Sequence, residues 1–201
     1  MGKASVKRRL LTPGLALLWV LAAATPLRAA DDVPLLSLSV GYYDQSLIDP
    51  GIGFLRVSPF QSEHQEAVDF RAEYRFGKSL LPGVEPWAKV KPWIGIEGTS
   101  QGAVYGVGGF LIDVPLGPFI FTPGFGAGWY SNGGGKDLGY PLEFRTQLEF
   151  GYAFENQSRI SLAYSHISNA NLGETNHGTN MISVYYHLPV SWLLGSRTVD
   201  D

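Results

Sequence analysis

Hydrophobic and polar side chains alternate with a period of two along most of the chain after residue 31. The alternation is clearest at residues 66–76, where apolar even positions face charged odd ones: Val68, Phe70, Ala72, Tyr74 and Phe76 against Asp69, Arg71, Glu73 and Arg75. Residues 141–153 repeat the pattern. Because successive side chains of a β-strand point to opposite faces, this period predicts strands with one apolar and one charged face.

Eight such segments can be drawn, at residues 35–43, 66–76, 91–98, 102–112, 119–130, 141–153, 159–168 and 180–190. An even number of antiparallel strands can close into a barrel without a free edge, as a bilayer requires. Aromatic residues gather on the apolar faces towards strand ends, as in the aromatic belts of membrane barrels: Tyr42, Tyr74, Phe76, Trp129, Phe150, Tyr152, Tyr164 and Tyr186. The sequence therefore predicts an all-β fold, an eight-stranded antiparallel transmembrane β-barrel of the outer membrane, whose inward-facing charges pair across a filled lumen.

Loop lengths agree with this topology in most places. With the N-terminus on the periplasmic side, the outward loops are residues 44–65, 99–101, 131–140 and 169–179, and the periplasmic turns are 77–90, 113–118 and 154–158. Outer-membrane barrels favour long outward loops and short periplasmic turns. Only the turn at 77–90 is longer than this rule predicts.

Residues 1–30 have the character of a secretory signal peptide. A basic start (Lys3, Lys7, Arg8 and Arg9) precedes an apolar stretch, and small residues follow at Ala29 and Ala30. An uncleaved membrane anchor is the alternative, although Pro13 and Pro26 shorten the apolar run. We therefore expect an exported chain in which residues 31–201 form a single β-barrel domain.

Composition and charge exclude several classes of function. Without residues 1–30 the chain has 10 basic and 18 acidic residues, a net charge of −8, so nucleic acid is not an expected partner. The absence of cysteine excludes thiol catalysis and cysteine-bound zinc. His64, His177 and His187 lack the spacing of metal ligands, and we expect them at the surface or at the membrane interface.

The segment at 164–171 carries the strongest candidate chemistry. Ile160, Leu162 and Tyr164 set an even-numbered apolar face, and strand parity places His166 and Ser168 on it. The next strand also has an even apolar face, which Asn180 begins. A His, a Ser and an Asn joined by one hairpin loop are therefore expected to point outward, where polar groups facing lipid are costly.

His166 and Ser168 have the spacing of a base and its nucleophile. Two strand residues on one face have Cα atoms roughly 6.6–6.8 Å apart, and an imidazole can span that distance. Such a pair performs acyl transfer when a third group orients the base. The alternative is that both residues simply end a strand at the interface. The His-x-Ser spacing alone favours that alternative, and the shared face with Asn180 and the position at the outer end of the barrel bring the two interpretations level.

The hairpin also resembles a known family, the PagL-type lipid A 3-O-deacylases of the Gram-negative outer membrane (acyloxyacyl hydrolase-related). The resemblance rests on His166-x-Ser168-Asn169-Ala170, Asn176-x-Gly178 and a terminal strand that ends in His187-Leu188-Pro189. It implies a serine esterase on the outer wall of an eight-stranded barrel. The implied substrate is lipid A or lipopolysaccharide in the outer leaflet, which loses the ester-linked 3-hydroxyacyl chain at position 3. The family implies no metal and no cofactor.

Residue by residue, the resemblance assigns Ser168 as the nucleophile, His166 as the general base and Asn169 to oxyanion stabilisation. Asn180 stands where the family has an acidic Glu. A neutral amide can accept the Nδ1 proton of the base but cannot stabilise the imidazolium with a charge. Either Asn180 therefore orients His166 alone or Glu174 in the loop substitutes for the missing carboxylate.

Two other functions stay open at the level of sequence. One is a non-catalytic eight-stranded outer-membrane barrel with a structural or lipid-binding role. The other is a soluble periplasmic lipid-binding barrel, which requires the charged faces of residues 66–76 and 141–153 to point outward. The sequence also leaves open whether the barrel forms a homodimer.

Overall fold

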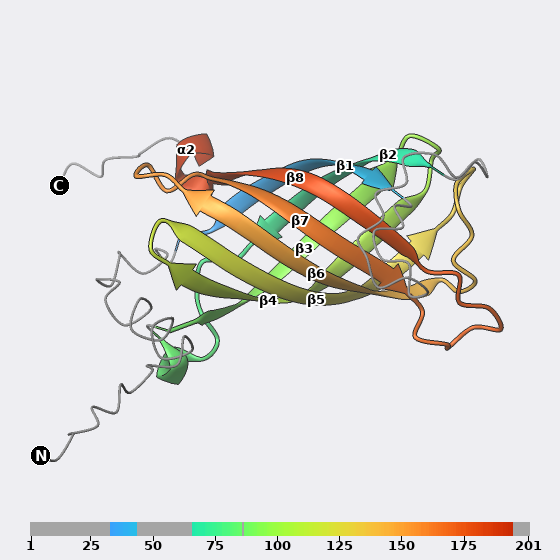
Figure 1. The fold of residues 1–201 in the computed structure, drawn as a ribbon, viewed down its shortest axis with the longest axis horizontal. Helices are drawn as coiled ribbons and strands as arrows, with labels where there is room; N and C mark the ends of the chain where they lie inside the picture. The colour runs from blue at the N-terminus through green and yellow to red at the C-terminus, as the bar shows by residue number, and fades with distance from the viewer. Residues whose placement is uncertain (1–32, 44–65, 86, 195–201) are drawn as a thin grey trace, which may run out of the picture.

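The chain folds into a closed antiparallel β-barrel of eight strands (Figure 1). The computed structural model describes residues 33–43, 66–85 and 87–194. The strands are β1 (Leu35–Tyr43), β2 (Ala67–Arg75), β3 (Lys89–Thr99), β4 (Val104–Leu116), β5 (Phe119–Ser131), β6 (Leu142–Ala153), β7 (Arg159–Ser168) and β8 (Thr179–Pro189). Each strand pairs with its neighbours in sequence, and β8 pairs back onto β1. The predicted fold class is confirmed, whereas the expected signal peptide at 1–30 and the loop at 44–65 lie outside the described residues.

Strand ends differ from the prediction mainly in the middle of the chain. β4 runs on to Leu116, so the turn predicted at 113–118 is wrong, and only residues 117 and 118 connect β4 to β5. Gly117 has a φ of +70°, a conformation that glycine adopts without strain, and this permits so short a turn. The turn between β2 and β3 is long, as predicted, and contains the short 3-10 helix η1 (Pro82–Val84).

The two ends of the barrel are different. The loops 100–103, 132–141 and 169–178 leave one end, here called the loop end, which is on the right in Figure 1. The short helix α2 (Val190–Leu194) and η1 lie at the opposite end. None of the helices in the described parts of the chain has the length and hydrophobicity to cross a membrane.

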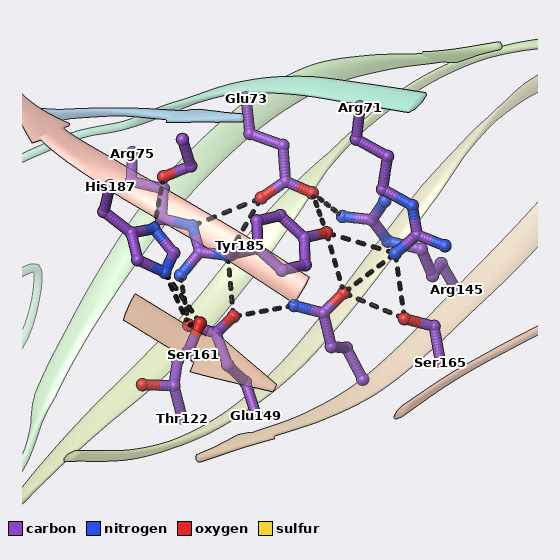
Figure 2. A network of polar contacts seen from close by, with 12 residues as sticks. Arg71, Glu73, Arg75, Thr122, Arg145, Glu149, Ser161, Ser165, Tyr185 and His187 are labelled. Atoms are coloured by element: carbon purple, nitrogen blue, oxygen red, sulfur yellow. Dashed lines mark hydrogen bonds and ion pairs between the residues drawn. The ribbon is translucent and has the colours of Figure 1, made fainter. Parts of the chain in front are cut away.

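Charged side chains fill the lumen and pair across it (Figure 2). Arg75 donates hydrogen bonds from Nη1 and Nη2 to the two carboxylate oxygens of Glu149, at 3.1 and 2.8 Å. Arg145 joins Glu73 to Glu97, with an Nη1–Oε2 distance of 3.2 Å to the latter. Burial of such charged groups is costly unless they are paired and hydrogen-bonded. The prediction of charges that pair inside the lumen is confirmed, and the outward charged faces that a soluble barrel requires are not found on β2 and β6.

His187 lies in this lumen network, so its expected place at the surface or interface was wrong. Its Nδ1 is 2.7 Å from Oγ of Ser37, and its Nε2 is 2.8 Å from Oγ of Ser161. The physical reason is parity, because the odd positions of β8 face inward and the ring stacks on Tyr185. His177 is exposed, as expected, and His64 lies outside the described residues.

The outer wall of the barrel is apolar. Exposed hydrophobic side chains occur on every strand, among them Val40, Phe70, Ile96, Phe110, Phe125, Leu148, Leu162 and Val184. A soluble protein does not leave so continuous an apolar surface in water, and lipid is the solvent that fits it. The barrel therefore presents an apolar wall to the bilayer and a paired polar interior.

Candidate active site

His166 and Ser168 lie on the outer face of β7, next to the loop end. Their neighbours Ser165 and Ile167 are both 0% exposed and point into the barrel, whereas His166 and Ser168 are partly exposed. The expectation that the even-numbered positions of β7 look outward is therefore correct. His166 and Ser168 therefore lie where the apolar outer wall meets the loop end, within reach of lipid.

The register between β7 and β8 places Asn180 directly opposite His166. The Nδ1 atom of His166 is 2.8 Å from Oδ1 of Asn180. Because a carbonyl oxygen only accepts hydrogen bonds, this contact puts the imidazole proton on Nδ1 and leaves a lone pair on Nε2. Asn180 thus holds the tautomer that a general base needs.

Glu174 does not take this position. It lies exposed in the loop 169–178, while the Nδ1 atom of His166 is bonded to Asn180. The sequence left both Asn180 and Glu174 as candidates to orient His166, and the structure places Asn180 against the imidazole.

Ser168 follows His166 by two residues on the same face, at the end of β7. Within the described part of the chain no hydrogen bond joins the two side chains, and in enzymes without substrate such contacts are often long. Gly178 has a φ of +57°, and a Cβ built on it would lie 3.2 Å from Cε1 and 3.7 Å from Nε2 of His166. The free edge of the imidazole therefore borders a space that Gly178 keeps open.

Tyr164 makes a contact that the sequence analysis did not foresee. Its hydroxyl group donates a hydrogen bond to Oδ1 of Asn180 at 2.9 Å, so two donors converge on one amide oxygen. Tyr164 was assigned to the aromatic belt, because parity shows which face a residue occupies but not which partner its hydroxyl group finds. Its position two residues before His166, on the same face, was the available signal.

Asn169 is fully buried beneath the hairpin loop. Its Nδ2 donates hydrogen bonds to the carbonyl oxygens of Leu138 at 3.0 Å and Thr175 at 2.8 Å, and its Oδ1 accepts the N–H of Asn171 at 3.0 Å. The side chain thus ties the hairpin to the neighbouring loop 132–141. Its oxyanion role stays a prediction, since both amide hydrogens are engaged by other carbonyl groups.

A tight turn follows Asn169. Ala170 and Asn171 have φ values of 52° and 63°, and the N–H of Leu172 donates to the carbonyl oxygen of Asn169 at 3.0 Å. Positive φ is unfavourable for alanine, and such strain is concentrated at functional sites. Among the described residues no backbone hydrogen bond from the N–H of Ala170 is found.

The loop 132–141 packs closely against the hairpin. Gly139 has a φ of +91°, and a Cβ there would lie 2.3 Å from the carbonyl oxygen of Thr175. A Cβ on Gly173 would lie 2.7 Å from the carbonyl oxygen of Gly139. The two loops therefore meet backbone to backbone, and sequence analysis missed this contact because the residues are far apart along the chain.

An apolar surface adjoins Ser168 on its other side. Phe144 of β6 pairs with Ser168 in the strand register, and its ring stacks on Phe125 with centroids 6.1 Å apart. Elsewhere in the described residues, no cluster of three His, Asp or Glu side chains has the arrangement of metal ligands. The site thus combines an oriented imidazole, a hydroxyl group and an apolar wall, an arrangement in which a hydroxyl group could act as a nucleophile at a lipid surface.

The sequence model of the lipid A 3-O-deacylase (PagL) family matches residues 68–189, more than half of the chain. This chain belongs to the PagL family. The match runs from the second residue of β2 to the end of β8 and includes His166, Ser168 and Asn180. The chain is therefore a member of an outer-membrane hydrolase family.

One solved structure supports the fold, and two further barrels are similar to a lower degree. The crystal structure of the outer membrane enzyme PagL is 18% identical, covers 77% of this chain and 99% of its own, and superposes with a TM-score of 0.54. Neisserial surface protein A is 9% identical, covering 78% of this chain and 96% of its own, with a TM-score of 0.48. De novo designed transmembrane β-barrels are 10% identical over 79% of this chain and 97% of theirs, with a TM-score of 0.47. No curated protein matches the sequence.

Proposed function

We propose that this PagL family member is a lipid A 3-O-deacylase in which Ser168 is the nucleophile and His166 the general base. The observation that carries the proposal is the hydrogen bond between Nδ1 of His166 and Oδ1 of Asn180, on the outer wall of the barrel. It gives the imidazole a lone pair on Nε2, on the same outward strand face that carries Ser168. The matched family supplies the substrate class.

The reaction proceeds in two halves. Oγ of Ser168 attacks the carbonyl carbon of the ester at position 3, and its proton passes to Nε2 of His166. The bond between that carbon and the sugar oxygen then breaks, and the imidazolium returns the proton to the departing oxygen. Water, activated by the same imidazole, hydrolyses the acyl-serine and releases the 3-hydroxy fatty acid.

Asn180 orients the base without supplying a charge. In a triad with a carboxylate, the third residue both fixes the tautomer and stabilises the imidazolium. The amide oxygen of Asn180 performs the first task, at 2.8 Å from Nδ1. We therefore expect a slower enzyme than one with Glu at this position.

The oxyanion is assigned to the backbone at the start of the hairpin loop. The N–H of Ala170 has no acceptor among the described residues and follows the nucleophile by two positions, which makes it the candidate donor to the oxyanion. Asn169 contributes through its side chain only if that side chain leaves the carbonyl oxygens of Leu138 and Thr175. Otherwise it acts by holding the loop that presents Ala170.

Phe144 and Phe125 receive the acyl chain in this proposal. Both side chains belong to the outer wall beside Ser168, and Phe125 is 51% exposed. An acyl chain of a lipid in the outer leaflet can lie against them without leaving the bilayer, so no enclosed pocket is needed. The site thereby acts on a substrate that arrives by lateral diffusion in the membrane.

The proposal is tested by mass spectrometry of lipid A from cells that express the chain. We expect wild type to release one 3-hydroxyacyl chain, and Ser168→Ala to lower the rate by on the order of 10³-fold or more. Ser131→Ala, an exposed serine at the loop end, is the matched control and should keep full activity. Both variants must show the heat-dependent gel mobility of a folded barrel.

Deacylation that persists in Ser168→Ala would refute the assigned nucleophile. A non-catalytic barrel is the second candidate, favoured by the missing carboxylate at position 180. Lipid A left intact by wild type and by Asn180→Glu alike would support that candidate and overturn the esterase.

A further inference from the structure

Two hydrogen-bond donors converge on Oδ1 of Asn180. Nδ1 of His166 lies 2.8 Å from this oxygen, and the hydroxyl oxygen of Tyr164 lies 2.9 Å from it. Both donors come from β7, two residues apart on its outer face. The amide oxygen is therefore held at one place by two contacts from the strand that carries the nucleophile.

This convergence matters because an amide, unlike a carboxylate, has two different ends. If Nδ2 of Asn180 faced the ring, it would donate to Nδ1, and the ring proton would move to Nε2. An imidazole protonated on Nε2 cannot accept the proton of Ser168. A chain with Asn at this position therefore needs something that keeps Oδ1, and not Nδ2, towards the base.

The hydroxyl group of Tyr164 meets this need. A phenol at the margin of an apolar wall loses stability when its proton has no acceptor, and Oδ1 of Asn180 is the acceptor that it has. Rotation of the amide by half a turn would bring Nδ2 towards the phenol, whose oxygen can accept its hydrogen, but the phenol proton would lose the acceptor that it has in Oδ1. The two contacts thus favour the same amide orientation.

We propose that Tyr164 is a positioning residue of the esterase, whose hydroxyl group holds the amide of Asn180 so that Oδ1 accepts the Nδ1 proton of His166. This inference rests on the proposed function and adds a residue to it. A tyrosine and an asparagine together replace the tautomer control that a single carboxylate provides. The charge of that carboxylate is not replaced.

A double-mutant cycle tests the inference with purified protein in detergent micelles and lipopolysaccharide as substrate. With Asn180 present, Tyr164→Phe should lower kcat about fivefold at nearly constant KM, the effect of one neutral hydrogen bond. With Asn180→Glu present, the same change should lower kcat less than twofold, because a carboxylate has two equivalent oxygens and cannot present a donor. The phenyl ring keeps the packing of the wall in both backgrounds.

Tyr186→Phe is the matched control, because Tyr186 is also an outward-facing tyrosine, on the neighbouring strand β8. It should leave kcat unchanged. Equal losses from Tyr164→Phe with Asn180 and with Glu at position 180 would overturn the inference, because the hydroxyl group would then act without Asn180. No loss in the Asn180 background would overturn it as well.

A second readout separates this inference from the proposed function. Nitrogen NMR of ¹⁵N-histidine-labelled protein distinguishes protonated Nδ1 from protonated Nε2, and His166→Gln assigns the signal. We expect protonated Nδ1 in wild type and a mixture in Tyr164→Phe. An unchanged tautomer in Tyr164→Phe would overturn the inference even if the enzyme is active. The expected change to a mixture of tautomers, in a protein without deacylase activity, would support the role of Tyr164 and would refute the proposed function.

Discussion

Gly178 offers the sharpest test of the site geometry, through the change Gly178→Ala. The residue has a φ of +57°, and a β-carbon there would lie 3.2 Å from Cε1 of His166. A non-glycine residue in the left-handed region costs about 1–2 kcal/mol, which predicts a modest loss of stability. The close approach adds a second effect, confined to the imidazole.

The size of that second effect follows from the distance. A carbon pair at 3.2 Å is closer than ordinary van der Waals contact, so the ring must move by a few tenths of an ångström. The ring is held by its 2.8 Å bond to Asn180, and any movement of the ring lengthens this bond or changes the direction in which Nε2 points. A misplacement of about 1 Å lowers rates by roughly 10²-fold, so a few tenths predict a loss of about fourfold to tenfold.

Gly117→Ala is the matched control. Gly117 has a φ of +70°, and a Cβ on it would meet nothing within 4 Å, at the far end of the barrel. It should have a similar loss of stability, seen as a lower temperature for the gel-mobility transition, with an unchanged initial rate of lipid A deacylation. Equal rates for the two variants would refute the claim that the imidazole edge beside Gly178 belongs to the reacting centre.

Two further predictions concern the third member of the site and its supporting loop. Asn180→Glu should raise the rate of lipid A deacylation at least about fivefold. The reason is that a carboxylate about 4 Å from the imidazolium contributes roughly 1 kcal/mol in water and more in a partly buried site. An initial rate equal to that of wild type would show that charge at this position does not act on the base. Gly139→Ala should lower the rate about tenfold or more while the barrel stays folded, because its β-carbon would lie 2.3 Å from the carbonyl oxygen of Thr175 and push the hairpin loop away. Full activity in this variant, measured as deacylation and compared with gel mobility, would show that the loop 132–141 does not position the hairpin.

Much of the barrel could be predicted from local pattern because each strand has two faces in different solvents. The lumen accepts paired charges and the bilayer accepts apolar groups, so the alternation along β2 and β6 records directly which residues face inward. The same parity correctly placed His166 and Ser168 outside. The expected surface position of His187 was wrong because it rested on the residue type, whereas the odd-numbered positions of β8 face the lumen.

The partners of individual side chains could not be predicted in the same way. The turn at Gly117 shows one reason, since a positive φ at a single glycine shortened a connection that composition alone suggested was longer. Asn169 shows another, because its carbonyl partner on Leu138 belongs to a loop about thirty residues earlier in the chain. Contacts of this kind depend on loop conformations that carry no repeating signal.

Alternation by itself determined the strands, their inward and outward faces, and the presence of a histidine and a serine together on the lipid-facing side, because burial in a barrel repeats every second residue. Only the tertiary structure decided that Asn180 lies opposite His166, that Tyr164 bonds to the same oxygen and that two loops meet through glycines. The first two contacts follow from the register of β7 against β8, and the third from the packing of the loop 132–141 against the hairpin loop. Register joins residues across strands, and a pattern along one strand contains no information about it.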